Sequence, residues 1–115
     1  MRYLLLIYDE PSALPDSKEA FDAMMADYAR YTAWLRETGQ LLGGEALQPV
    51  SDATTVSVRA GRRVVTDGPF AETKEHLGGY YLIEAGDLDA AIEAAARVPS
   101  ASIGKVEIRP ILEMG

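Results

Sequence analysis

The chain has 115 residues, of which 48% are hydrophobic, so we expect a single compact domain, residues 1–115, with its own core. Its formal net charge is −7, with 18 acidic against 11 basic residues, which argues against nucleic acid as a partner because phosphate binding needs clustered lysine and arginine. It contains no cysteine, which excludes disulfides, thiolate metal sites and thiol catalysis.

The segment from Tyr3 to Tyr8 predicts a strand that is apolar on both faces. One face carries Tyr3, Leu5 and Ile7, and the other carries Leu4, Leu6 and Tyr8. We therefore expect both faces to be covered. The apolar run is too short for a signal peptide and no segment is long enough to span a membrane, so we expect a cytoplasmic protein without a membrane partner.

Apolar residues then recur at spacings of three and four, which predicts a long amphipathic helix from about Ser17 to Thr38. Asp16 and Glu19 form a capping box at its start, and Gly39 ends it. The apolar positions of this helix are Phe21, Met24, Tyr28, Tyr31 and Leu35.

The rest of the chain predicts five short strands and a second helix. The strands are residues 41–47, 54–58, 63–66, 80–84 and 105–112. The second and third of these form a hairpin that turns at Ala60 and Gly61, and the first is bulged at Gly43 and Gly44. The second helix starts at a cap formed by Asp87 and ends at residues 98–99.

This order of elements predicts an α+β, ferredoxin-like fold, the split βαβ arrangement, with an inserted β-hairpin. Both helices of that fold lie on one face of an antiparallel sheet, yet strands 3–8 and 80–84 carry large apolar side chains on both sides. Soluble monomers rarely expose such a patch, so we expect a homodimer closed sheet against sheet. The alternative is that segment 48–78 of the same chain covers the second face.

One loop between predicted strands holds five ionisable side chains, namely Asp67, Glu72, Lys74, Glu75 and His76. Asp67 either caps the turn, by accepting backbone N–H groups of residues 70–73, or serves as a general base. His76 is the only imidazole of the chain, so any proton transfer by histidine must use it. Glu72 and Lys74 either form solvated ion pairs or contribute to a ligand site.

One histidine and no cysteine leave too few good ligands for zinc or haem, so we expect no metal and no cofactor. Arg109 is predicted to lie beside Glu107 on the outer face of the last strand, which the proposed dimer would bury. A buried arginine needs a carboxylate, and the alternatives are Asp67, Glu107 of a second copy, or an acidic small molecule.

The segment 67–75, Asp-Gly-Pro-Phe-Ala-Glu-Thr-Lys-Glu, followed by Gly78-Gly79-Tyr80-Tyr81, resembles the YCII-related proteins of the DGPF type. Segments 1–8, 39–45, 87–92 and 106–111 resemble the same family, so the resemblance extends along nearly the whole chain. It implies a dimeric α+β barrel and a genetic link to extracytoplasmic-function sigma factors. Shorter YCII proteins carry a His and Asp pair in their cleft, with the histidine on the first helix. This chain has no histidine there, and Tyr28 and Tyr31 are the side chains expected to face that cleft.

Two functions of different classes remain open. The first, which we favour because the expected histidine is absent, is a non-catalytic dimeric module that binds a small molecule or a protein partner such as a sigma factor. The second is a cofactor-free acid/base enzyme that acts on a small acidic metabolite in a cleft beside the loop, with Asp67 and His76 as catalytic groups. The ligand-binding candidates are Tyr28, Tyr31, Trp34, Glu72, Lys74 and Arg109.

A discriminating observation exists for each hypothesis. A concave apolar pocket with convergent polar groups would favour the enzyme. A filled interior, with Asp67 and Arg109 paired to each other, would favour the module.

Overall fold

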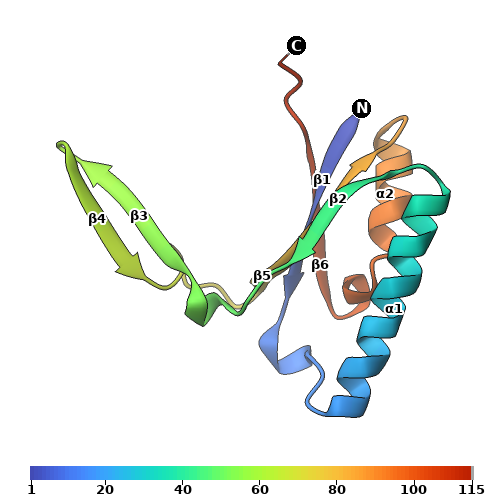
Figure 1. Cartoon of the computed structure of the whole chain (residues 1–115), viewed down its shortest axis with the longest axis horizontal. Helices are drawn as coiled ribbons and strands as arrows, with labels where there is room; N and C mark the ends of the chain where they lie inside the picture. The colour runs from blue at the N-terminus through green and yellow to red at the C-terminus, as the bar shows by residue number, and fades with distance from the viewer. Residues whose placement is uncertain (115) are drawn as a thin grey trace.

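The computed structural model describes residues 1–114 as a four-stranded antiparallel sheet with two helices on one face and a separate projecting hairpin (Figure 1). The sheet strands are β1 (Arg2–Asp9), β2 (Leu41–Ala46), β5 (His76–Glu84) and β6 (Gly104–Pro110). The helices are α1 (Lys18–Glu37) and α2 (Leu88–Ala96), and the hairpin consists of β3 (Thr54–Arg59) and β4 (Arg62–Asp67). The sheet order β2-β5-β1-β6 is that of the ferredoxin-like α+β fold, so the predicted fold class is confirmed.

Side-chain caps begin both helices. Ser17 caps α1 by accepting the backbone N–H of Ala20 at 3.1 Å, so the capping box predicted at Asp16 was wrong by one residue. Gly39 ends this helix as predicted, with a φ of 75° that favours glycine. Asp87 caps α2, also as predicted, because its carboxylate accepts a backbone N–H of the first turn at 2.8 Å.

Strand β5 is longer than the sequence indicates. It begins at His76 rather than at Tyr80, and its ladder to β1 continues past an irregularity at Gly78. Glycine is depleted in strands, so the pair Gly78 and Gly79 concealed the first half of the strand. Four residues that were expected in a loop therefore belong to the sheet.

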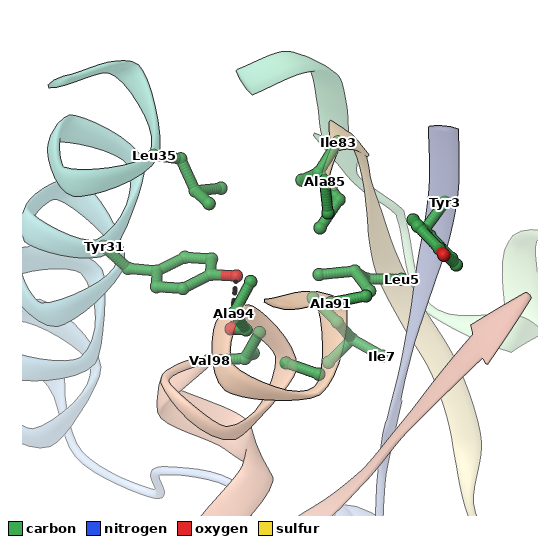
Figure 2. Packing of buried hydrophobic residues seen from close by; sticks show 11 residues of the cluster. Tyr3, Leu5, Ile7, Tyr31, Leu35, Ile83, Ala85, Ala91, Ala94 and Val98 are labelled. Carbon is green, nitrogen blue, oxygen red and sulfur yellow. Dashed lines mark hydrogen bonds between the residues drawn. The ribbon is translucent and has the colours of Figure 1, made fainter. Parts of the chain in front are cut away.

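The hydrophobic core lies between the sheet and the two helices (Figure 2). Leu5 and Ile83, from the two central strands, and Leu35, from α1, are fully buried. Tyr31 donates its hydroxyl proton to the carbonyl oxygen of Ala94 at 2.8 Å and so joins α1 to α2 (Figure 2). No helix among residues 1–114 is long and apolar enough to cross a membrane.

The opposite face of the sheet, called the open face below, carries no helix (Figure 1). Strand β1 alternates strictly between buried residues on the helix side and half-buried residues on the open face. The hairpin does not cover this face, because it extends away from the sheet and all six residues of β4 are exposed (Figure 1). The apolar residues of the open face are Leu4, Leu6, Tyr8, Leu77, Tyr80 and Leu82.

Candidate functional site

A cavity of about 420 Å³ opens between α1 and the part of the sheet formed by β2 and β5. We call it the α1 cleft. Its walls are mostly apolar and include Met24, Met25 and Leu41, and its size is typical of small-molecule sites. The polar side chains that line it are Asp9, Tyr28, Thr32, Arg36 and Tyr81.

Several glycines line the cleft, and the lack of side chains at these positions leaves the cavity open. Gly43, Gly44, Gly78 and Gly79 all line the cavity. A Cβ atom on Gly78 would lie 2.6 Å from Oδ2 of Asp9, so the carboxylate occupies the space that a side chain would need. The irregularity of the β1–β5 ladder falls at this residue, and such bulges often re-aim side chains beside functional sites.

Asp9 is the most unusual side chain in the cleft. It is only 9% exposed, and its Oδ1 has no hydrogen-bond partner among residues 1–114. Burial raises the pKa of the Asp9 carboxyl, and the neighbouring Ser100 hydroxyl offsets part of that rise. Because burying an unpartnered carboxylate costs stability, Asp9 is a candidate functional group.

Two hydroxyl groups lie beside Asp9 and complete what we call the Asp9 cluster. The hydroxyls of Tyr28 and Ser100 are 2.6 Å apart, and Ser100 is fully buried in the short 3-10 helix Pro99–Ser102. Burial raises the pKa of the Tyr28 phenol, the hydrogen bond with Ser100 offsets part of that rise, and the negative charge of Asp9 adds to it. Tyr28 therefore stays protonated at neutral pH and can act as a hydrogen-bond donor.

The cleft also carries a second polar pair and one charged side chain. The hydroxyls of Thr32 and Tyr81 are 2.7 Å apart, which links α1 to β5 across the cavity. Arg36 lines the cavity but is exposed, so it lies at the rim, whereas Glu45 is the ladder partner of Tyr80 and faces the open side of the sheet. Among residues 1–114, no three His, Asp or Glu side chains form a group that could hold a metal ion.

The structure places the three predicted aromatic ligand residues in different surroundings. Tyr28 lines the α1 cleft. Tyr31 is 5% exposed in the core, where its hydroxyl is bonded to Ala94. Trp34 packs against the core from outside, with the guanidinium of Arg97 4.4 Å from its ring centroid. Of these three aromatic residues, Tyr28 is the one that lines the cleft.

The ionisable residues of the 67–76 loop do not gather at one point. Asp67 ends β4, is exposed, and makes no side-chain hydrogen bond within the described chain. Glu72 is also exposed. Lys74 forms an ion pair with Glu10 at 3.6 Å, and Glu75 pairs with Lys105. These two pairs tie the loop to the ends of β1 and β6.

His76 and Arg109 lie on the main sheet. His76 is the ladder partner of Asp9 in the β1–β5 pair, and such partners share a face with Cβ atoms about 4.5–5.5 Å apart. Arg109 lies opposite Leu4 on the open face and forms its ion pair with Glu107 of the same strand. The chain thus brings His76 beside Asp9, and it pairs Arg109 with Glu107 rather than with Asp67.

Sequence reasoning missed Asp9, Ser100 and Arg36. A signal for Asp9 existed, because the period of two that buries Tyr3 and Ile7 also puts position 9 on the helix side of the sheet. Ser100 gave no comparable signal, since its partner Tyr28 is 72 residues away in the chain.

We expect Gly78→Ala to disturb the cleft, because the new Cβ would meet Asp9 Oδ2 at 2.6 Å and displace the carboxylate. The clashing oxygen is the far end of a side chain and can give way, so we expect the low end of the roughly 1–3 kcal/mol that overpacking costs in the free energy of unfolding. Gly43→Ala is the matched control, since its Cβ would meet nothing within 4 Å and should change stability by less than about 0.5 kcal/mol. Urea denaturation measures both, and equal stability of the two variants would contradict the close approach of Asp9 to Gly78.

Comparison with known proteins gives three findings. The family model described as the YCII-related domain matches residues 1–115. An uncharacterised protein of Rhizobium meliloti (strain 1021) is 39% identical over 114 residues, covering 96% of this chain and 92% of the relative. Among solved structures, 5-chloro-2-hydroxyhydroquinone dehydrochlorinase from Burkholderia phenoliruptrix AC1100, in complex with 2,5-dihydroxybenzoquinone, is similar with a TM-score of 0.53 over 99% of this chain and 96% of that chain. Its sequence identity is 16%, so the likeness shows the shared fold alone.

Proposed function

The chain belongs to the YCII-related family, and we propose that it is a cofactor-free acid/base enzyme that binds a small molecule in the α1 cleft. The observation that carries the proposal is the buried Oδ1 of Asp9, which has no hydrogen-bond partner among residues 1–114. Asp9 lines the cleft, so a bound molecule that donates a hydrogen bond to its carboxyl would offset the cost of burying it. The cleft is also concave and mostly apolar with convergent polar groups, which favours an enzyme over a module with a filled interior.

The roles of the residues follow from their chemistry. Asp9 is the general base: its raised pKa brings it closer to neutrality, where proton transfer is most effective. It takes a proton from an O–H or an acidic C–H of the substrate, and the bonding electron pair stays on the substrate. Tyr28 donates a hydrogen bond to the oxygen that gains charge, and Ser100 orients the Tyr28 hydroxyl. His76, the ladder partner of Asp9, is the group that can pass the proton on.

The same lining defines a substrate class. The deep end, at Asp9, accepts a hydrogen-bond donor, and the walls of Met24, Met25 and Leu41 accept an apolar body. Arg36 at the rim offers a fork for a carboxylate. We therefore propose a small hydroxylated carboxylic acid with an apolar body as the substrate.

The test is a thermal-shift panel of hydroxybenzoic acids and hydroxylated aliphatic acids, each beside its methyl ester. A ligand at 100 times its dissociation constant stabilises the folded state by about 2.7 kcal/mol, which is a shift of several degrees. We expect acids to stabilise the wild type, Asp9→Ala, which lacks the acceptor oxygen, to lose the shift, and Arg36→Gln to respond to acids no better than to esters. Arg30→Gln is the matched control, because Arg30 lies on α1 but pairs with Asp27 outside the cleft. A shift that survives Asp9→Ala would refute the role of this carboxyl in binding, and a wild type that no acid stabilises would refute the substrate class.

A homodimer is a second proposal, and the open face supports it. Its apolar residues are half-buried and no helix of the described chain lies over them, so a second copy stacked sheet against sheet would remove them from water. The ion pair of Arg109 with Glu107 lies on the same face, where a partner would desolvate it. A sigma factor as protein partner stays a proposal that rests on the family resemblance.

A further inference from the structure

The β3–β4 hairpin, which we call the arm, stands apart from the rest of the molecule. It forms its own two-stranded sheet with no ladder to the main sheet, and it extends away from it (Figure 1). The Cα radius of gyration is 16.1 Å, although a compact domain of this length should have about 13 Å. An isolated two-stranded hairpin is marginally stable in water, so the arm lacks the packing that would hold it.

One face of the arm is apolar and free. Val56 and Val65 are direct ladder partners, and Val58 follows on the same face of β3. These three valines are 57%, 58% and 60% exposed. Valine stabilises strands chiefly by packing on neighbours, so this valine face needs a surface to cover it.

The tip of the arm is positively charged, whereas the chain as a whole is negatively charged. Arg59, Arg62 and Arg63 lie around the turn, whereas the whole chain has a net charge of −7. A second copy of the chain, which is negatively charged as a whole, therefore attracts the tip of the arm. The arm also lies on the side of the sheet opposite the helices, which is the side of the open face (Figure 1). A copy stacked on the open face would therefore lie next to the arm.

We propose that the arm docks on a second copy of this chain through its valine face, so that two copies clasp each other reciprocally. The proposal rests on the proposed homodimer and adds a second contact surface to it, distinct from the open face. By two-fold symmetry each copy gives one arm and receives one, so the dimer contains two equivalent arm contacts.

The test measures the dimer dissociation constant of two variants by sedimentation velocity. Their substitutions are adjacent in β3 and lie on opposite faces of the arm. Val56→Asp puts a charge in the valine face, and Ser57→Asp puts the same charge on the other face of the arm. We expect Val56→Asp to raise the dissociation constant at least about tenfold and Ser57→Asp to change it less than about threefold, since truncating one packed contact typically has effects of that size. Leu6→Lys, on the open face, reports on the sheet contact separately.

The outcomes separate the two proposals. A dissociation constant that rises in Leu6→Lys and stays unchanged in Val56→Asp overturns the clasp and leaves the sheet-to-sheet dimer. A wild type that is monomeric at every concentration overturns both.

Amide hydrogen exchange of residues 54–67 is the second measurement, and it uses the wild type alone. Exchange that slows when the protein concentration exceeds the dimer dissociation constant supports the clasp. Exchange that stays as fast in the dimer as in the monomer overturns it and leaves the valine face to another partner.

Discussion

Asp9→Asn is expected to stabilise the folded protein at neutral pH and to abolish acid/base activity in the α1 cleft. The wild-type carboxylate is buried, and its Oδ1 has no partner among residues 1–114. Leaving a buried polar group unsatisfied costs about 1–3 kcal/mol, and more when it is charged. Asparagine keeps the shape and removes the charge but still leaves a polar amide buried, so we expect a gain of about 1 kcal/mol in the free energy of unfolding.

The stability gained by Asp9→Asn should increase with pH. Burial raises the pKa of the Asp9 carboxyl, so the folded protein holds this proton more tightly than the unfolded chain does. Below the ordinary pKa of an aspartate the carboxyl is neutral in both states, and wild type and Asp9→Asn should be nearly equal in stability. As the pH rises to the raised pKa, the wild type loses stability, and above it the full difference should be present.

Urea denaturation of both proteins from pH 3 to 8 measures this difference. Asp16→Asn is the control, because Asp16 is exposed and should give a difference that does not follow this pH course. A variant less stable than the wild type at pH 7 would show that Asp9 is a structural partner rather than a group held ready for a ligand. A functional residue that costs stability is a common trade-off in enzymes.

The fold could be predicted from the sequence because local patterns and tertiary packing agree in most elements. The strict alternation in β1 predicts its buried face correctly. The spacing of three and four in α1 predicts the burial of Tyr31 and Leu35, whereas Phe21, the first residue of the predicted stripe, is exposed. The pattern failed in the part of β5 that lines the cleft. Gly78 and Gly79 are typical of a loop, yet they belong to β5, and Gly78 leaves room for the Asp9 carboxylate. Glycine at these two positions reflects close approach of the Asp9 carboxylate and of the β2 backbone.

The candidate site was predicted only in part, since charge density along the chain is a poor guide to where charges meet. Residues 67–76 drew attention because five ionisable groups are close in sequence, but Lys74 and Glu75 pair with Glu10 and Lys105 far along the chain. Tyr28 could be found because it lies on the apolar stripe of α1. Asp9 looked like an ordinary residue at the end of a strand, and only the β1–β5 register and the burial of its carboxylate distinguish it.

Leu5→Lys and Leu6→Lys differ by one position in β1 and should fail in different ways. Leu5 is fully buried against the helices, so lysine there removes core packing and brings an unpaired ammonium into the core. Large losses of core packing cost about 2–5 kcal/mol, a large part of the roughly 5–15 kcal/mol that holds a domain folded. We expect the melting temperature to fall by at least about 10 °C, because 1 kcal/mol corresponds to about 4–8 °C in a domain of roughly this size.

Leu6, by contrast, lies half-buried on the open face, opposite Tyr80 of β5 and Glu107 of β6. A lysine there can extend its ammonium to water in a single copy, so circular dichroism should show an intact fold. In a dimer stacked sheet against sheet the same ammonium would be buried, so sedimentation should show a monomer where the wild type is dimeric.

A Leu6→Lys protein that dimerises as tightly as the wild type would mean that the open face is not the contact. A Leu5→Lys protein that melts like the wild type would mean that the helices do not cover position 5. Because the two side chains are identical and adjacent, any difference between the variants comes from the face that each residue occupies.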